Sequence, residues 1–140
     1  MTTSIFIDSV ALVAIMSPRD QKHQSALKLL SKSIKIKSNI ITTDYVIDES
    51  TTHLITSVKS GFRYSSSLLD WILQINTPIQ LIWMNNNLFL QAVKVFQRFN
   101  KDKQWSFTDC TSFVVMKELK ISTVFTFDDH FEQMGFKILK

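Results

Sequence analysis

Short apolar runs alternate with amphipathic segments along most of the chain. Runs rich in β-branched and aromatic residues predict strands over residues 4–7, 40–42, 79–83, 123–127 and 136–139. Helical periodicity predicts helices over residues 10–15, 21–33, 45–59 and 64–75, and a longer one after the polar residues 85–87. Strands that alternate with helices specify an α/β fold, in which a mainly parallel sheet carries helices on both faces in three layers.

Polar residues at the segment ends predict where several helices begin. We expect Asp44 to be the N-cap of the helix over residues 45–59, and Gly61 to separate that helix from the next. Ser106 and Asp109 have the spacing of a capping box, so a further helix is expected to begin there. That helix is apolar nearly all round and is therefore expected to be buried against the sheet.

Four acidic residues lie where apolar, strand-like runs end. They are Asp8, Glu49, Asp109 and Asp128. Because the carboxyl ends of parallel strands share one edge of a sheet, these side chains can converge on a single crevice. Carboxylates crowded together raise one another's pKa unless a cation lies between them, and a hard divalent ion such as Mg²⁺ or Mn²⁺ prefers oxygen ligands. Such a site is suited to metal-assisted phosphodiester cleavage.

Each acid taken singly also fits a helix N-cap. Asp8 is the exception, since a charge directly after a buried strand is costly to desolvate without a partner. Strand alternation over residues 124–128 places Asp128 on one face with Thr126, so Asp129 is expected to point elsewhere or to cap the next turn. Asp48 and Glu49 flank the apolar side of their helix at similar angles, and the helical pattern leaves both candidates open.

Length and charge fit one small domain with a polyanionic partner. A chain of 140 residues is typical of a single domain over residues 1–140. Sixteen basic residues against 12 acidic ones give a net charge of +4, and several of the acids already belong to the expected crevice. A basic exterior around an acidic pocket suits RNA or DNA, although an ordinary lysine-rich surface is the alternative interpretation.

Other classes of site and compartment receive less support. No apolar run approaches the length of a membrane helix, and the first residues lack the segments of a secretion signal. Cys110 is the only cysteine, which excludes an internal disulfide and fits the reducing cytoplasm. We expect Cys110 to be a small buried residue rather than a nucleophile, and the three histidines lack the spacing of a zinc site.

The expected acids lie in four stretches of the sequence. They are Phe6-Ile7-Asp8-Ser9-Val10-Ala11-Leu12, Thr43-Asp44-Tyr45-Val46-Ile47-Asp48-Glu49-Ser50-Thr51, Ser106-Phe107-Thr108-Asp109-Cys110-Thr111-Ser112-Phe113 and Phe125-Thr126-Phe127-Asp128-Asp129-His130-Phe131. Together these stretches resemble the motifs of PIN-domain nucleases, and within them the VapC-type toxin ribonucleases. The resemblance covers nearly the whole chain and implies a PIN-like α/β/α domain. It also implies that Asp8, Glu49, Asp109 and Asp128 are the metal ligands, which favours Glu49 over Asp48. Thr108 would orient a carboxylate or a bound water through its hydroxyl.

The function that the resemblance implies is a metal-dependent endoribonuclease, a hydrolase of phosphodiester bonds. It would use Mg²⁺ or Mn²⁺ on single-stranded or structured RNA, act as the toxin of a toxin–antitoxin pair or in RNA processing, form a homodimer, and bind a cognate antitoxin protein. A non-catalytic PIN-fold RNA-binding or scaffold protein is the alternative. The presence of all four acids argues against it, because a binder of polyanions has no reason to keep an acidic cluster.

Two further expectations concern the end of a helix and the surface. Chains of this family often carry a glycine where the third-motif helix ends, whereas Glu118-Leu119-Lys120 stands here. A left-handed Lys120 would cost about 1 kcal/mol, so that helix is expected to end differently. Trp71, Trp83 and Phe89 offer more large apolar surface than a small core readily hides, which favours self-association; the alternative is that they fill the core.

Overall fold

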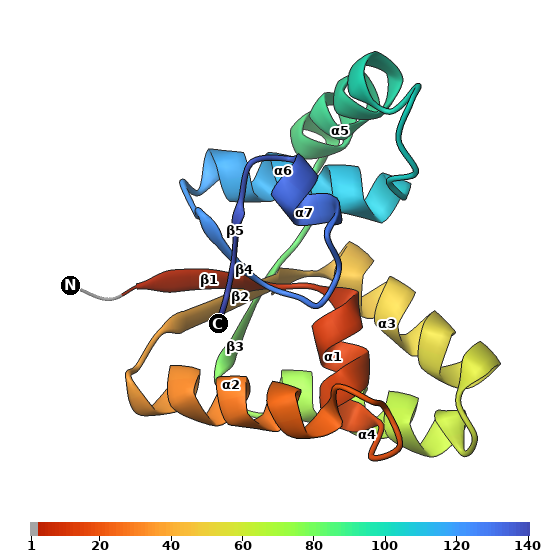
Figure 1. The fold of residues 1–140 in the computed structure, drawn as a ribbon, viewed down its shortest axis with the longest axis vertical. Helices are drawn as coiled ribbons and strands as arrows, with labels where there is room; N and C mark the ends of the chain where they lie inside the picture. Colours follow the sequence, from red (N-terminus) through yellow and green to blue (C-terminus); the bar gives the residue numbers. More distant parts are fainter. Residues whose placement is uncertain (1–2) are drawn as a thin grey trace.

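Five strands form one sheet at the centre of the computed structural model, which describes residues 3–140 (Figure 1). They are β1 (Ser4–Ile7), β2 (Asn39–Thr43), β3 (Ile79–Ile82), β4 (Thr123–Phe125) and β5 (Lys137–Ile138), in the order β3-β2-β1-β4-β5. Every neighbouring pair is parallel. The expected parallel α/β architecture is confirmed. Met1 and Thr2, part of the segment in which we expect no secretion signal, lie outside the described residues.

Helices cover both faces of the sheet. They are α1 (Ser9–Met16), α2 (His23–Lys35), α3 (Asp44–Ser57), α4 (Gly61–Leu73), α5 (Asn86–Phe99), α6 (Phe107–Glu118) and α7 (His130–Gln133). Figure 1 shows α1, α2 and α4 on one side of the sheet and α6 and α7 on the other, with α5 outside α6. Helix α3 leads away from the carboxyl ends of the strands and contacts α1, α4 and α6. Among residues 3–140, no helix is long and apolar enough to span a membrane.

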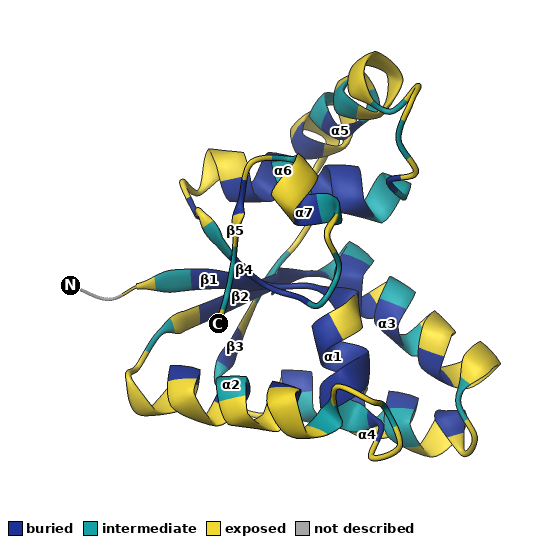
Figure 2. Ribbon diagram, in the orientation of Figure 1, coloured by how far each residue is buried: buried dark blue, intermediate teal, exposed yellow. Residues whose placement is uncertain are grey.

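The central strands are buried on both faces, as their continuous apolar sequences require. Phe6 in β1 and Phe125 in β4 are fully buried, and Figure 2 shows the exposed positions mainly on the outer surfaces of the helices. Ile5 lies beside Ile40 in β2 and Thr123 in β4, so β1 is the middle strand of the sheet. A polar residue that follows β1 therefore enters the most enclosed part of the sheet edge.

Helix α3 begins one residue earlier than expected, and its cap is Thr43 rather than Asp44. Thr43 is the last residue of β2, and its hydroxyl oxygen accepts a hydrogen bond from the backbone N–H of Val46 at 3.1 Å. Asp44 lies inside the first turn and accepts the N–H of Met84 at 2.9 Å. Strand and helix are thus continuous here, because Thr43 completes the β2 ladder and still caps α3.

Lys120 contradicts the expectation that α6 ends without a left-handed residue. Its φ is 56°, and the N–H of Ile121 bonds to the carbonyl of Met116 at 2.8 Å, the pattern of a Schellman motif. Ile121 is buried. That hydrogen bond and the burial of Ile121 offset the cost of about 1 kcal/mol for a left-handed lysine, so no glycine is required.

The C-terminal strands are shorter than expected, and the connection between α3 and α4 is tighter. Strand β4 ends at Phe125, because the Thr126 hydroxyl accepts the N–H of Asp128 at 3.1 Å in a turn. Gly61 lies inside α4, at its first residue, where a Cβ atom would stand 1.8 Å from the carbonyl oxygen of Leu54. Only glycine allows α3 and α4 to approach so closely.

Candidate active site

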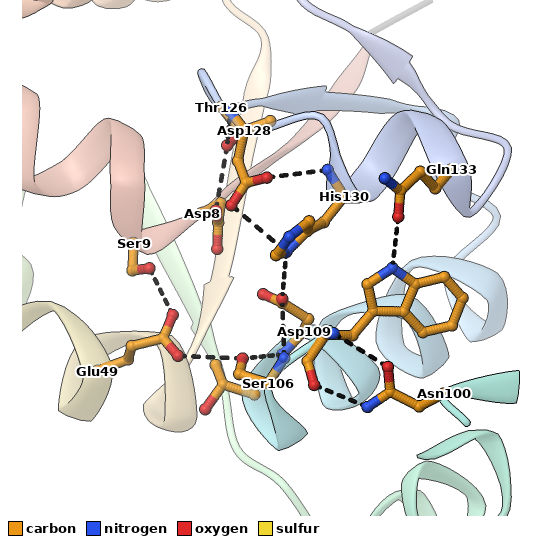
Figure 3. Close-up of polar contacts among 12 residues, drawn as sticks. Asp8, Ser9, Glu49, Asn100, Ser106, Asp109, Thr126, Asp128, His130 and Gln133 are labelled. Atoms are coloured by element: carbon orange, nitrogen blue, oxygen red, sulfur yellow. Dashed lines mark hydrogen bonds and ion pairs between the residues drawn. The ribbon is translucent and has the colours of Figure 1, made fainter. Parts of the chain in front are cut away.

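Three of the four expected acids converge at the carboxyl edge of the sheet. Asp8 follows β1, Glu49 lies in α3 and Asp109 lies in the first turn of α6. One carboxylate oxygen from each lies within 4.8 Å of the others (Figure 3). We call these three residues the carboxylate cluster. Its members are brought together by one strand end and two helices that meet at the same edge, as the parallel sheet predicts.

Asp8 is the most enclosed member of the carboxylate cluster, with 1% of its surface exposed. Its Oδ2 accepts a hydrogen bond from the hydroxyl of Thr126 at 3.1 Å, while Oδ1 is buried without a hydrogen-bond partner. Burial, followed by the negative charges of Asp109 and Glu49, raises the pKa of Asp8 from 3.8 to about 7. The side chain is therefore held in a place where its own negative charge is costly.

Glu49, rather than Asp48, faces the cluster. Its Oε1 accepts a hydrogen bond from the hydroxyl of Ser9 at 2.5 Å, and its Oε2 accepts one from Ser106 at 3.2 Å. Asp48 is exposed on the outer side of α3. The helical pattern alone left this pair open, and the contacts with α1 and with the start of α6 distinguish them.

Asp109 serves both as a helix cap and as a member of the cluster. The capping box is confirmed, because Ser106 Oγ accepts the N–H of Asp109 and Asp109 Oδ2 accepts the N–H of Ser106 at 3.1 Å. The same Oδ2 lies 2.9 Å from His130 Nδ1. Asp109 is 5% exposed. One buried side chain therefore both caps α6 and belongs to the carboxylate cluster.

Asp128 lies beside the carboxylate cluster and is linked to it by His130. The N–H of His130 donates to Asp128 Oδ1 at 2.9 Å, and His130 Nδ1 lies 3.5 Å from Asp128 Oδ2. Burial of the imidazole lowers its pKa, but the hydrogen bond to Asp109 and the charges of Asp128, Asp109 and Asp129 outweigh burial, so the pKa of His130 lies above its ordinary value. A protonated His130 would partly neutralise both neighbouring carboxylates (Figure 3).

Two residues differ from what the sequence led us to expect. Asp129 stands at the N-cap position of α7, as one of the two alternatives predicted, but its side chain makes no capping hydrogen bond, and its carboxylate lies within 4.8 Å of ligand atoms of Asp128 and His130. The reason is that β4 ends at Phe125, so strand alternation does not extend to Asp129. His130 lacks the spacing of a zinc ligand, yet its place two residues after Asp128 in the fourth motif is a sequence signal for its position beside the carboxylates.

Hydroxyl groups hold the carboxylates in place, but the hydroxyl of Thr108, which the resemblance implied, is not among them. They belong to Ser9, Ser106 and Thr126. Within residues 3–140, no hydrogen bond joins the hydroxyl of Thr108 to a carboxylate, and a role for Thr108 in orienting water stays a prediction. Cys110 is fully buried, and burial and then Asp109 raise its pKa to about 11, so it is a thiol rather than a nucleophile.

A family model described as the PIN domain matches residues 5–137. The chain belongs to the PIN-domain family. The 23S rRNA-specific endonuclease VapC20 of Mycobacterium tuberculosis is 26% identical to it over 132 residues, which are 94% of this chain and 95% of that protein. The crystal structure of VapC20, described as a sarcin–ricin loop cleaving toxin, matches this PIN domain with a TM-score of 0.82 over the same shares.

A more distant relative supports the fold. The structure of FitAcB from Neisseria gonorrhoeae matches with a TM-score of 0.65 and 12% identity, and the match covers 97% of this chain and 96% of that one. At this identity the likeness concerns the fold alone. The PIN-like architecture implied by the four motifs is thus confirmed by the family match and by two solved structures.

Proposed function

We propose that this PIN-domain protein is a metal-dependent endoribonuclease and the toxin of a toxin–antitoxin pair. The observation that carries the proposal is the convergence of Asp8, Glu49 and Asp109 within 4.8 Å at the carboxyl edge of the sheet. The likeness to VapC20, an rRNA endonuclease, over 94% of the chain supports the reaction class. Two buried acids and a partly buried one at such proximity are costly for a folded protein unless they serve a purpose.

The donor set of the carboxylate cluster fits a hard divalent cation. Its atoms are all carboxylate oxygens, which Mg²⁺ and Mn²⁺ prefer. Oδ1 of Asp8 is buried and has no hydrogen-bond partner. Within residues 3–140, no lysine or arginine forms an ion pair with a member of the cluster. Asp8, Glu49 and Asp109 would therefore hold the ion, with Asp128 as a fourth carboxylate at the edge of the site.

The surrounding residues position the ligands. A bound ion would supply a water nucleophile of lowered pKa and stabilise the charge that develops on the phosphate. Ser9 and Ser106 fix the two oxygens of Glu49, and Thr126 fixes Oδ2 of Asp8. His130 orients Asp109. Such outer hydrogen bonds commonly determine both metal affinity and activity.

The proposed substrate is a structured ribosomal RNA. VapC20 is described as specific for 23S rRNA and as cleaving the sarcin–ricin loop. A net charge of +4, with several acids confined to the site, leaves an outer surface that attracts the RNA backbone. A toxin that acts on ribosomes works in the cytoplasm, and a cognate antitoxin protein would neutralise it.

A homodimer is the proposed assembly. Trp83 is 68% exposed and Phe89 39% exposed, and both lie between the end of β3 and the first turns of α5. Trp71, which the sequence grouped with them, is half-buried against the core and takes no part in this surface. Apolar exposure of this kind favours association with a second copy of the chain.

Incubation of the purified protein with ribosomal RNA separates a nuclease from the non-catalytic alternative. We expect cleavage at a defined site in Mn²⁺ or Mg²⁺, mapped by primer extension, and none in EDTA. An RNA-binding or scaffold protein would instead retard the RNA on a gel and leave it intact with either ion. Intact RNA across ribosomal and transfer RNA substrates would refute the proposed activity.

A further inference from the structure

Two adjoining cavities run along one side of the carboxylate cluster. One, of about 380 Å³, is lined by Glu49 and Ser9 of the site; the other, of about 390 Å³, is lined by Arg19 and Lys59. The remaining lining residues of the second cavity include Ser17, Pro18, Ser57, Val58, Ser60 and Tyr64. Asp20 and His53 line both cavities, which therefore form one continuous feature. We call it the α1–α3 groove.

The charge along the α1–α3 groove changes sign. Its inner end is formed by Glu49, whereas its outer end carries the side chains of Arg19 and Lys59. Both basic residues are exposed, and within residues 3–140 neither forms an ion pair. Asp20 is engaged locally, since its Oδ1 accepts the N–H of Lys22 at 2.8 Å. Among the described residues, the outer end of the groove therefore carries net positive charge, because Arg19 and Lys59 outnumber Asp20 and form no ion pair.

The opposite flank of the site has the reverse character. A cavity of about 400 Å³ there is lined by Asp128, Asp129 and Glu132, with Lys140 as its one basic lining residue. Phosphate groups that approach along this flank meet net negative charge. Of these two flanks, the one with Arg19 and Lys59 therefore attracts a polyanion bound at the carboxylate cluster more strongly.

We infer that the α1–α3 groove binds the phosphodiester backbone of the RNA on one side of the bond that is cut. Arg19 and Lys59 contact phosphates, and the partly buried ring of Tyr64, which lines the same cavity, offers a face on which a base stacks. The inference rests on the proposed ribonuclease function. It adds the residues that bind the flanking nucleotides and the direction in which they leave the site.

The salt dependence of RNA binding tests the groove apart from catalysis. The probe is a synthetic hairpin with the sarcin–ricin loop sequence, bound to protein that carries Asp109→Asn. Each phosphate contact to a single strand contributes roughly 0.7 to the slope of log K against log salt, so Arg19→Gln/Lys59→Gln should reduce that slope by roughly 1.4 and the affinity at 0.1 M salt roughly 25-fold. Lys28→Gln/Lys35→Gln, the same charge change on exposed positions of α2 away from the groove, should leave both unchanged.

Further variants decide the remaining outcomes. Arg19→Lys/Lys59→Arg should keep the wild-type slope, because the charges remain. In the cleaving protein, Arg19→Gln/Lys59→Gln should raise KM and leave kcat close to wild type, with an unchanged melting temperature. An unchanged salt slope, or an equal loss in the α2 control, overturns the groove assignment. If the wild type does not cut the hairpin, the proposed substrate is wrong, while the salt slope still decides whether the groove binds RNA.

Discussion

Asp8 is the residue at which burial and charge conflict most strongly. It follows the three buried residues 5–7 of β1, its Oδ1 lacks a partner, and two further carboxylates lie close to it. The sequence alone indicated this conflict, because Asp8 stands between two apolar runs. A cation that binds there gives the buried oxygen a partner and relieves the repulsion between the carboxylates. Asp8 therefore destabilises the metal-free fold most and contributes most to the stability gained when the metal binds.

The metal-free protein should lose stability as pH rises from about 4 to about 7. The pKa of Asp8 is about 7 in the folded chain against 3.8 as its ordinary value, so the folded state binds the proton more tightly. Its contribution is complete below about pH 4 and disappears as the pH passes 7, and a gap of about three pKa units corresponds to roughly 4 kcal/mol.

Urea unfolding in EDTA at pH 5 and pH 8 measures this contribution. Asp8→Asn, which cannot ionise, should be less sensitive to pH than the wild type by roughly 2.6 kcal/mol, because about two of the three pKa units lie between pH 5 and pH 7. Addition of Mn²⁺ at pH 8 should restore the stability of the wild type and not that of the variant. The same pH dependence in both proteins would show that Asp8 does not titrate as described.

The contacts that hold the carboxylates are the least predictable part of the site. Glu49 and Ser106 are 57 residues apart, and Asp8 and Thr126 are 118 apart. Local periodicity carries no information about such pairs, because they depend on how the helices pack at the sheet edge. His130 was missed for the same reason, since its ring meets Asp109 only in the folded chain.

At the scale of elements, the start of α6 both stabilises that helix and positions a residue of the carboxylate cluster. Ser106 caps the helix through the N–H of Asp109 and also donates its hydroxyl to Glu49. The sequence predicted the cap from spacing alone. Asn85 caps α5 in the same way, by accepting the N–H of Leu88 at 2.9 Å, but within residues 3–140 no hydrogen bond joins it to the carboxylate cluster. The two caps therefore form a matched pair.

Ser106→Ala and Asn85→Ala should have similar effects on stability and different effects on cleavage. Loss of either cap costs about 1 kcal/mol in the free energy of unfolding. Only Ser106→Ala also releases Glu49, so its cleavage rate should fall roughly 10-fold or more, as is usual when a hydrogen bond to a metal ligand is lost. Denaturant unfolding and RNA cleavage assays measure the two effects. Equal cleavage by the two variants would argue against a role for Ser106 in positioning Glu49.

At the scale of the whole molecule, the alternation of strands and helices correctly predicted the parallel sheet and its carboxyl-edge site. The order β3-β2-β1-β4-β5 does not follow from that alternation, because the pattern specifies elements and not their neighbours. The ends of elements were also less predictable. Lys120 takes a left-handed conformation because buried Ile121 stabilises the turn, and that compensation is invisible in the local sequence.

The exposed apolar surface near the start of α5 should mediate a homodimer. Trp83 is 68% exposed and Leu90 59% exposed. We expect sedimentation velocity at tens of micromolar to show a dimer, and Trp83→Glu to shift it to a monomer, since a buried unpaired charge opposes association. Leu73→Glu, at a position on α4 that is 75% exposed, is the control and should remain dimeric. A wild type that sediments only as a monomer would contradict the assembly.

Cleavage of the sarcin–ricin hairpin by Asp109→Asn tests most directly whether the carboxylate cluster is a metal-dependent nuclease site. The amide keeps an oxygen for the capping box but removes the charge on a metal ligand, so the fold should persist while the rate falls by roughly a thousandfold or more. Asp48→Asn, an exposed neighbour of Glu49, is the control and should cut at the wild-type rate. Asp129 is unsuitable as a control because its carboxylate lies beside His130. Cleavage by Asp109→Asn at the wild-type rate, in Mn²⁺ and with an intact fold, would contradict the assignment of the active site.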